Sequence, residues 1–181
     1  ETSCNTYFHE VGSRTTIDKI DKWAKLFGLG ELTGIDIAGE QKGIRANKET
    51  KKRLRNDDWR PADTAQTAIG QFDNAFTPLQ LVSYISTIAN GGKSYKPHLI
   101  KKVISYDGSL VKESEIEYRQ VPVKKETIDA VKEGMVAVVN STDGTAAEVF
   151  RDFPFEVAGK TGTAETGNES KHSSNALFVC Y

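Results

Sequence analysis

The sequence predicts a mixed α+β fold in which helices flank an antiparallel sheet. Apolar residues recur at helical spacing mainly in the first half of the 181-residue chain, whereas β-rich runs bounded by turn residues lie mainly in the second half. With 38% hydrophobic and 27% charged residues, the chain has enough apolar side chains for a packed core. We expect residues 1–92 to form a mainly helical part and residues 93–181 a mainly sheet part of one domain.

Helix signals mark most of the first 92 residues. The first helix is expected to start at Ser3, a residue type that caps helices, and its apolar stripe is expected to end at Gly12. A basic helix at residues 47–56 is interpreted as a solvated face and not as a nucleic-acid site. Proline favours the first turn of a helix, so Thr77-Pro78 marks another helix start. We expect helical segments at residues 3–15, 16–27, 47–56, 63–71 and 77–90, with a turn-rich stretch at 32–43.

The second part combines a hairpin, a long helix and a terminal pair of strands. The dipeptide at 107–108, Asp-Gly, is typical of a hairpin turn between two β-rich runs. Residues 142–145 are expected to cap a short helix that ends near Phe150. A polar turn at 166–174 joins the last two strands. We expect strands at residues 95–105, 111–121, 155–165 and 175–181, and the long helix at 125–140.

The composition excludes several classes of protein. The chain has 24 Lys and Arg against 25 Asp and Glu, a net charge of −1, whereas a nucleic-acid-binding protein needs a basic surplus for phosphate contacts. No apolar run approaches the roughly eighteen residues of a membrane span, and the first residues do not resemble a signal peptide. Two cysteines do not make a disulfide framework. Because the apolar run at 175–181 stops without a polar tail, we expect the chain to be a piece of a longer protein.

Two short motifs carry the candidate chemistry. Lys160-Thr-Gly-Thr163 lies on a predicted strand, where glycine lets a substrate approach the backbone, and the lysine and the first threonine can hold a carboxylate. Ser3-Cys-Asn5 puts a hydroxyl and a carboxamide two residues apart at the N-terminal end of a predicted helix. Alone, this pattern is typical of a helix N-cap. Together, in this chain order, the motifs fit the signature of penicillin-recognising serine enzymes.

These motifs and several longer runs give the chain a resemblance to a known family. It resembles the transpeptidase domain of class B penicillin-binding proteins, most of all the rod-elongation or sporulation type of low-GC Gram-positive bacteria. The resemblance implies a penicillin-binding-protein/β-lactamase-like transpeptidase fold, incomplete at both ends. The matching runs are Ser3-Cys-Asn-Thr-Tyr-Phe8, Thr33-Gly-Ile-Asp-Ile-Ala-Gly-Glu40, Ala68-Ile-Gly-Gln71, Thr77-Pro-Leu-Gln80, Ile88-Ala-Asn-Gly-Gly92, Lys96-Pro-His-Leu99 and Val157-Ala-Gly-Lys-Thr-Gly-Thr-Ala164.

The resemblance implies a serine D,D-transpeptidase that cross-links the D-Ala-D-Ala stem peptides of peptidoglycan through an acyl-enzyme and that binds β-lactams. Ser3 would pass a proton toward the leaving amine, and Asn5 would hydrogen-bond the substrate amide. Lys160 and Thr161 would bind the terminal carboxylate, and the backbone N–H of Thr163 would be one oxyanion donor. The implied catalytic residues are Ser3, Asn5, Lys160 and Thr163, and the implied substrate-binding residues are Thr161, Gly162 and Thr163.

The resemblance also implies that half of the active site lies elsewhere. In the family the nucleophilic serine and its lysine form a Ser-x-x-Lys motif that would precede Glu1. No Ser-x-x-Lys in a suitable context occurs in this chain, so we expect it to be inactive alone. The implied partners are that upstream segment, stem peptides, β-lactam antibiotics and other cell-wall synthesis proteins, with no nucleic acid. The implied location is the extracytoplasmic face of the bacterial cell membrane, with the anchor outside this chain.

Four positions that depart from the family's pattern are possible metal ligands: Cys4, Asp73, His172 and Cys180. They form a plausible tetrahedral set for a structural zinc ion, although the transpeptidase chemistry requires no cofactor. Eight strand residues between His172 and Cys180 would span about 25 Å unless the strand bulges. His9 or His98 would be replacements for His172. The alternative is two buried free thiols and a surface histidine.

Two further functions stay open on the sequence alone. The same fold can serve as a β-lactam sensor or as a catalytically inactive scaffold, in which case a membrane signalling segment, and not a pedestal domain, would precede residue 1. A class D-like β-lactamase is the third candidate. The long separation between Ser3 and Lys160 and the long segment at 71–92 argue against it.

Overall fold

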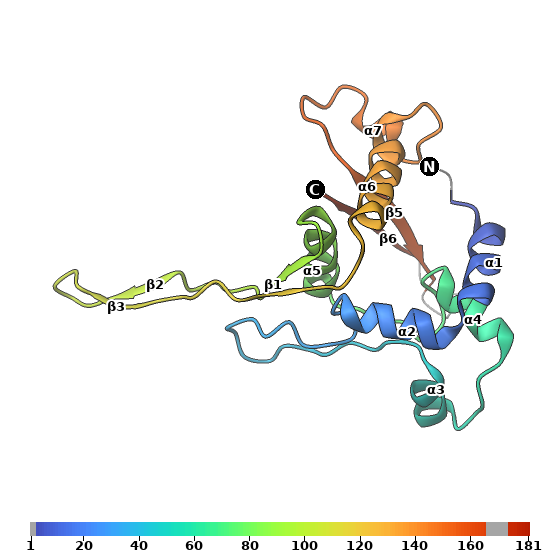
Figure 1. The fold of residues 1–181 in the computed structure, drawn as a ribbon, viewed down its shortest axis with the longest axis horizontal. Coiled ribbons are helices and arrows are strands. Elements are labelled where there is room, and N and C mark those ends of the chain that lie inside the picture. The colour runs from blue at the N-terminus through green and yellow to red at the C-terminus, as the bar shows by residue number, and fades with distance from the viewer. Residues whose placement is uncertain (1–2, 166–173) are drawn as a thin grey trace.

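The computed structural model describes residues 3–165 and 174–181. Within them, five helices precede four strands, and two helices and two strands follow (Figure 1). None of the described helices is long and apolar enough to cross a bilayer. The helices are α1 (Asn5–Thr15), α2 (Ile17–Leu26), α3 (Lys48–Arg55), α4 (Pro61–Ala68), α5 (Pro78–Ala89), α6 (Lys125–Asn140) and α7 (Ala147–Phe150). The strands are β1 (Lys93–Tyr95), β2 (Lys102–Ile104), β3 (Leu110–Glu113), β4 (Tyr118–Gln120), β5 (Gly159–Ala164) and β6 (Asn175–Cys180).

Helix α1 packs against α4 through a glycine contact. Gly12 is buried within α1, and a Cβ atom at this position would lie only 2.2 Å from the Cβ of Ala68 on α4. The predicted end of the first helix at residue 15 is confirmed, because α1 runs to Thr15 and Gly12 lies within it. The glycine serves the close approach of the two helices, which leaves no room for a side chain.

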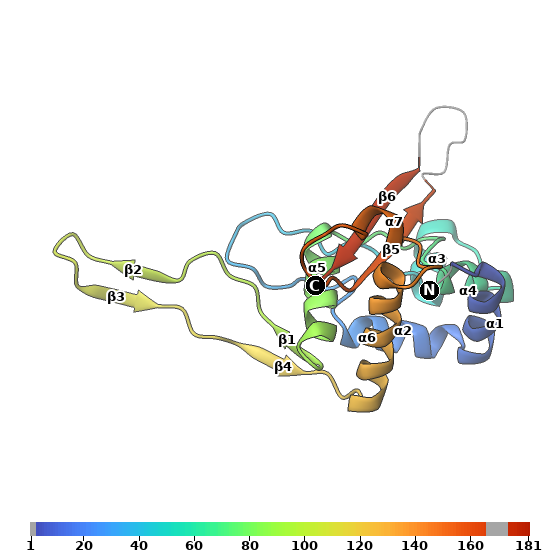
Figure 2. The same cartoon turned by 90° about the horizontal axis from the view of Figure 1, so that it is seen from above.

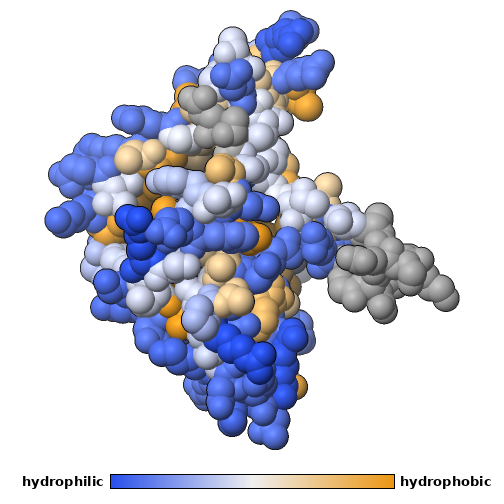
Figure 3. Space-filling view, turned by 90° about the vertical axis from the view of Figure 1, so that its right-hand side faces the viewer, coloured by the Kyte–Doolittle hydropathy of each residue, from blue (hydrophilic) through white to orange (hydrophobic). Residues whose placement is uncertain are grey.

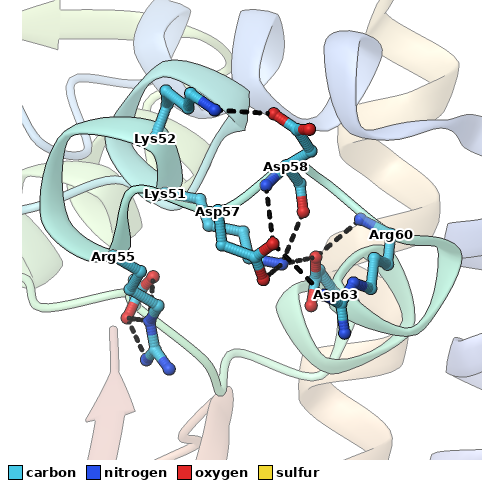
Figure 4. A network of polar contacts seen from close by, with 8 residues as sticks. Lys51, Lys52, Arg55, Asp57, Asp58, Arg60 and Asp63 are labelled. Atoms are coloured by element: carbon cyan, nitrogen blue, oxygen red, sulfur yellow. Dashed lines mark hydrogen bonds and ion pairs between the residues drawn. The ribbon is translucent and has the colours of Figure 1, made fainter.

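Most basic residues of helix α3 are exposed to solvent, but Lys51 is buried. The side chain of Lys51 is 4% exposed, and its ammonium lies 2.7 Å from the Asp63 carboxylate and 3.1 Å from that of Asp57 (Figure 4). It also donates a hydrogen bond to the backbone carbonyl of Asp58 at 2.7 Å. Because a buried ammonium needs such partners, the prediction of a fully solvated helix is wrong at Lys51. It holds for the exposed residues Lys48, Lys52, Arg53 and Arg55.

The main apolar core lies where α5 and α6 meet the β5–β6 pair. Ile85 and Ile88 of α5 pack with Met135 of α6 and with Ala158, just before β5. Figure 1 shows α6 alongside the two strands. Helix α6 has the bounds predicted from its apolar spacing, residues 125–140. A second cluster joins the end of α6 to the segment before α7, and its buried members are Val138, Val139 and Ala146.

Helix α5 starts with a capping box that also fixes the preceding turn-rich segment. The Thr77 hydroxyl accepts from the Gln80 N–H at 3.2 Å, and the Gln80 side chain accepts from the Thr77 N–H at the same distance. The buried Gln80 amide also donates to the carbonyls of Glu31 and Lys42, at 2.6 and 2.8 Å. Since buried amides are satisfied by such bonds, Gln80 ties residues 31–42 to α5. The helix start predicted at Thr77 is confirmed.

Residues 93–120 form a long two-stranded arm that extends away from the rest of the molecule (Figures 1 and 2). The hairpin turn at 107–108 lies at its tip, as predicted. Each predicted strand is interrupted, because β1 pairs with β4 and β2 with β3 as separate antiparallel sheets. At the interruption the Asp36 carboxylate accepts from the N–H groups of Leu99 and Ile100, at 2.8 and 2.9 Å. These amides are thereby engaged with a loop and not with the opposite strand.

Candidate active site

The Lys160-Thr-Gly-Thr163 motif lies on β5, which pairs antiparallel with β6 and with no other strand in the described part of the chain. Ala158 and Tyr181 exchange two backbone hydrogen bonds, of 3.1 and 3.0 Å. Along an antiparallel pair, such residues alternate with residues whose N–H and C=O point away from the partner strand. Thr161 and Thr163 occupy these alternate positions. Their backbone groups therefore face the side of β5 opposite to β6, which we call the open edge.

The ammonium of Lys160 lies at this open edge. Its Nζ atom donates to the carbonyl oxygen of Thr161 at 2.6 Å. Desolvation by surrounding atoms lowers the pKa of Lys160 below its ordinary value, although part of the side chain remains exposed. A cation held against the strand in this way is placed to pair with an anionic group that binds at the edge.

The hydroxyl groups of Thr145 and Thr161 lie 3.0 Å apart. The short helix predicted to end near Phe150 is confirmed as α7, but its N-cap is Ala146 and no side chain caps it. The prediction that residues 142–145 cap this helix is therefore wrong. The hydroxyl of Thr145 is engaged with β5 instead, so the loop before α7 contacts the candidate site.

Gln71 is not among the predicted site residues, yet its side chain contacts β5. Its Nε2 atom donates to the carbonyl oxygen of Thr163 at 3.0 Å, one of the acceptors of the open edge. Gln71 follows α4, which packs against α1, so this bond connects the helical part of the chain to the strand. The one sequence signal for it is the run Ala68-Ile-Gly-Gln71, which matched the family without an assigned function.

Ser3, Cys4 and Asn5 are exposed at the start of α1. The N-cap is Cys4 and not Ser3, and no side chain caps the helix. Figure 1 shows α1 at the right-hand side of the molecule, apart from β5 and β6, and α1 packs mainly against α4. Figure 3, seen from the α1 side, shows a mainly hydrophilic face with small apolar areas. In the part of the chain that the structure describes, no hydrogen bond joins these three residues to β5.

The predicted zinc ligands are only partly described, because His172 lies outside the described residues. Cys4 and Cys180 are free thiols, and both are exposed. The alternative of two buried thiols is therefore wrong. Among residues 3–165 and 174–181, no group of three Cys, His, Asp or Glu side chains is arranged to hold a metal ion, and this includes the possible replacements His9 and His98.

Asp73 and Cys180 lie at different ends of β5. The Asp73 carboxylate forms an ion pair with Arg55 at 2.5 Å, in the loop that contacts Thr163. Cys180 stands opposite Gly159 in the strand register, roughly 13 Å along the strand from Thr163. The structure therefore does not bring these two predicted ligands together.

Ser109 and Lys112 have the Ser-x-x-Lys spacing, which makes them the pair to compare with the expected nucleophile motif. They lie at the start of β3, in the extended arm and not on a helix. Residues three apart on a strand point to opposite faces, whereas on a helix they share one. The Ser109 hydroxyl donates to the Asp107 carboxylate at 2.7 Å within the turn. The hydroxyl of Ser109 is therefore engaged within the turn.

A family model described as the penicillin binding protein transpeptidase domain matches residues 1–181. The fold fits this match, with helices packed on an antiparallel strand pair whose open edge carries the Lys-Thr-Gly motif. The chain therefore belongs to the penicillin-binding protein transpeptidase domain family, as a class B member.

The chain is 35% identical over 166 residues to peptidoglycan D,D-transpeptidase MrdA of Haemophilus influenzae, covering 90% of this chain and 25% of that protein. It is 34% identical over 183 residues to Stage V sporulation protein D of Bacillus subtilis, covering 100% of this chain and 26% of that protein. Among solved structures, penicillin-binding protein PBP2 in its complex with MreC from Helicobacter pylori matches with a TM-score of 0.81 and 33% identity, covering 98% of this chain and 31% of that one. The chain thus spans about a quarter of the length of the curated relatives it matches.

Proposed function

We propose that the protein containing this chain is a serine D,D-transpeptidase that cross-links the stem peptides of peptidoglycan. The observation that carries the proposal is the open edge of β5. There the backbone groups of Thr161 and Thr163 point outward beside the ammonium of Lys160. An extended peptide can add to such an edge through backbone hydrogen bonds, and its terminal carboxylate is attracted by the lysine.

The proposed reaction is acyl transfer. A serine outside this chain, activated by its lysine, attacks the D-Ala carbonyl, and Ser3 passes the displaced proton to the terminal D-Ala as the C–N bond breaks. Asn5 hydrogen-bonds the substrate amide, and the Thr163 N–H donates to the developing oxyanion. The amine of a second stem peptide then attacks the ester, forms the cross-link and returns the proton to the serine. A β-lactam enters the same first step by opening its ring.

The remaining finer proposals concern the whole protein. We place residues 1–181 within one transpeptidase domain whose nucleophile lies in an upstream segment, on the extracytoplasmic face of the cell membrane of a low-GC Gram-positive bacterium. The similarity to the Bacillus subtilis sporulation protein over the whole chain supports this origin. The complex of the Helicobacter pylori relative with MreC supports other cell-wall synthesis proteins as partners.

The second candidate is a β-lactam sensor or an inactive scaffold of the same fold. A sensor also needs the open edge of β5 for acylation, so the edge does not separate the two functions. Turnover does, because a sensor stops at the acyl-enzyme whereas a transpeptidase passes the acyl group to an amine.

The test uses the full-length protein with a fluorescent penicillin and with a D-Ala-D-Ala stem peptide plus an acceptor amine. We expect covalent labelling together with release of D-Ala and a cross-linked product. Labelling without any peptide product would identify a sensor or scaffold, and no labelling would overturn both. Residues 1–181 alone should not be labelled, because their one Ser-x-x-Lys pair lies in the extended arm.

The structural zinc ion is a separate proposal that the chemistry does not require. It rests on the residue types Cys4, Asp73, His172 and Cys180, and the geometry of Asp73 and Cys180 does not favour it. The test is the zinc content of the purified protein, measured on samples that were never exposed to a chelator. Close to one equivalent of zinc, lost in a Cys180→Ser variant, would support the site, and a near absence of zinc would exclude it.

A further inference from the structure

We propose that Gln71 is a positioning residue for the open edge of β5, and that Arg55, Phe72 and Asp73 hold it in place. The inference rests on the proposed transpeptidase function and adds residues to its machinery. It starts from one contact between segments far apart in the sequence. The Gln71 amide donates to the carbonyl of Thr163, 92 positions further along the chain, at 3.0 Å.

The hydrogen bond from Gln71 acts on Thr163, the residue whose N–H is the proposed oxyanion donor. The register of β5 with β6 leaves both backbone groups of Thr163 pointing outward, so no strand in the described residues fixes the Thr163 carbonyl. Gln71 is its hydrogen-bond donor. The N–H of the same residue is the proposed oxyanion donor, and catalysis by such a donor depends on its being held in place before the reaction. A bond that orients Thr163 therefore bears on the rate of acylation.

The residue after Gln71 needs an external restraint. Phe72 has a φ of +69°, the left-handed region that a side chain with a Cβ rarely occupies. Holding such a conformation in a non-glycine residue costs free energy, so the surroundings must favour it. Glycine would adopt this φ without that cost, but it would offer no ring for contacts.

The restraint comes from α3. The Arg55 guanidinium lies 4.9 Å from the centre of the Phe72 ring, a cation–π distance. The same guanidinium donates through Nη2 to the Asp73 carboxylate at 2.5 Å and through Nε at 3.2 Å, and the Asp73 side chain is only 10% exposed. Trp59 packs its ring edge-to-face on Phe72, at 5.5 Å between centres. One arginine thus fixes two successive residues of the loop.

The Gln71 backbone is held as well. Asn74 donates from its side-chain amide to the Gln71 carbonyl at 3.2 Å. With Arg55 on the two residues in between, the loop is restrained on both sides of its turn. Contacts therefore run without a gap from α3 through Asp73 and Phe72 to Gln71, and from there to Thr163 on β5. We call Arg55, Phe72 and Asp73 the clamp.

The experiment compares three variants of the full-length protein. Gln71→Asn shortens the side chain by one methylene, so its amide no longer reaches the Thr163 carbonyl. Arg55→Met removes both the ion pair and the cation–π contact. Arg53→Met is the matched control, because Arg53 is also exposed on α3 and makes no hydrogen bond or ion pair within the described residues.

Two measurements are made on each variant. Acylation by a fluorescent penicillin is resolved into its binding constant and its rate constant at saturation, and amide hydrogen exchange is followed in the peptide that contains β5. We expect Gln71→Asn and Arg55→Met to lower the rate constant by roughly threefold to tenfold, the size expected for one lost hydrogen bond. Binding should change less than the rate, and β5 should exchange faster. Arg53→Met should match the unsubstituted protein.

The outcomes separate this inference from the proposed function. If the unsubstituted protein is not acylated, the proposed function fails, while exchange still tests the clamp. If acylation is normal and neither variant changes the rate constant or the exchange of β5, the positioning role is wrong. An effect of Gln71→Asn without one of Arg55→Met overturns the clamp alone. An effect on melting temperature and binding, with the rate constant intact, reduces Gln71 to a structural residue and also overturns the proposal.

Discussion

The hydroxyl of Thr145 lies 3.0 Å from the hydroxyl of Thr161, so the loop between α6 and α7 holds the threonine of the Lys-Thr-Gly motif. The end of α6 is tied to the same region, because the Asn140 side chain donates to the carbonyl of Val157 at 3.0 Å. Helix α6 therefore contributes one polar contact to this region, through Asn140, besides the apolar packing of Met135 against Ala158, and the loop that follows α6 contributes the second, through Thr145.

Replacing Thr145 by valine should slow acylation without unfolding the protein. The substitution keeps the shape of the side chain and removes the hydroxyl that restricts Thr161. We expect the acylation rate to fall by about threefold to tenfold, as for the loss of one hydrogen bond. Thr145→Ser, which keeps the hydroxyl, is the control. Equal rates in the valine and serine variants would show that Thr145 does not orient Thr161.

Replacing Lys160 by alanine should impair acylation far more than stability. The ammonium is placed to pair with a carboxylate, and losing a charge-assisted contact costs about 1.5–3 kcal/mol, equivalent to roughly tenfold to more than a hundredfold in rate. The melting temperature should change little, because the pKa of Lys160 is lowered by desolvation, which means that the fold disfavours its charge. A sharply lower melting temperature with unchanged acylation would contradict the assigned role.

The lowered pKa of Lys160 also predicts a pH dependence. Below its folded-state pKa the residue is charged and binds the substrate carboxylate. As the pH rises through that value, which lies below the ordinary value for lysine, the charge and the contact are lost. Acylation of the unsubstituted protein should therefore fall on the alkaline side. In the Lys160→Ala variant the part of the fall that is due to this residue should be missing, which a rate profile against pH measures.

Removing the buried ammonium of Lys51 should destabilise the α3–α4 region. Lys51→Met leaves the Asp63 carboxylate, which is 12% exposed, without its closest cation, and an unpaired buried charge is costly. We expect the melting temperature to fall by several degrees. Lys52→Met is the control, because Lys52 pairs with Asp58 in solvent, with both side chains more than half exposed. Equal melting temperatures for the two variants would show that burial does not matter here.

Acid should weaken the same network. Burial alone would raise the pKa of Asp63, but hydrogen bonds from Lys51 and from the backbone N–H of Arg60 outweigh it, and the pKa is lowered. A carboxyl with a lowered folded-state pKa stabilises the fold above its unfolded pKa, and this contribution is lost as the pH falls through the folded value. Thermal unfolding below pH 4 should therefore be less sensitive to Lys51→Met than unfolding at pH 7.

Much of this architecture follows from local patterns in the sequence. The apolar spacing of residues 125–140 gave the bounds of α6, and Thr77-Pro78 gave the start of α5, because capping and periodicity are properties of neighbouring residues. The interruption of the arm was not predictable in this way. It depends on Asp36 binding the amides of Leu99 and Ile100, which are more than sixty positions away.

The same limit applies to the site. The residues of the Lys-Thr-Gly motif were found from their types and order, and their strand is β5. Gln71 and Thr145 were missed, because each acts through one hydrogen bond to a residue distant in sequence. The basic pattern of its helix predicts a solvated Lys51, and only the fold brings Asp57 and Asp63 to it.

The contact between Gly12 and Ala68 makes α1 sensitive to a small substitution. Gly12→Ala would place a Cβ 2.2 Å from the Cβ of Ala68, so one helix must move. Such overpacking costs about 1–3 kcal/mol. A shift of α1 also displaces Ser3 and Asn5 at its start, so we expect slower acylation together with lower stability.

Gly134 on α6, unlike Gly12, has room for a side chain. A Cβ at this position meets nothing within 4 Å, and Gly134 lies in the middle of a 16-residue helix. Gly134→Ala should therefore stabilise the protein by about 0.5–1 kcal/mol through helix propensity, and acylation should not change. Chemical denaturation of both variants measures the two effects. If Gly12→Ala were as stable as Gly134→Ala, the close approach of α1 to α4 would not be present in solution.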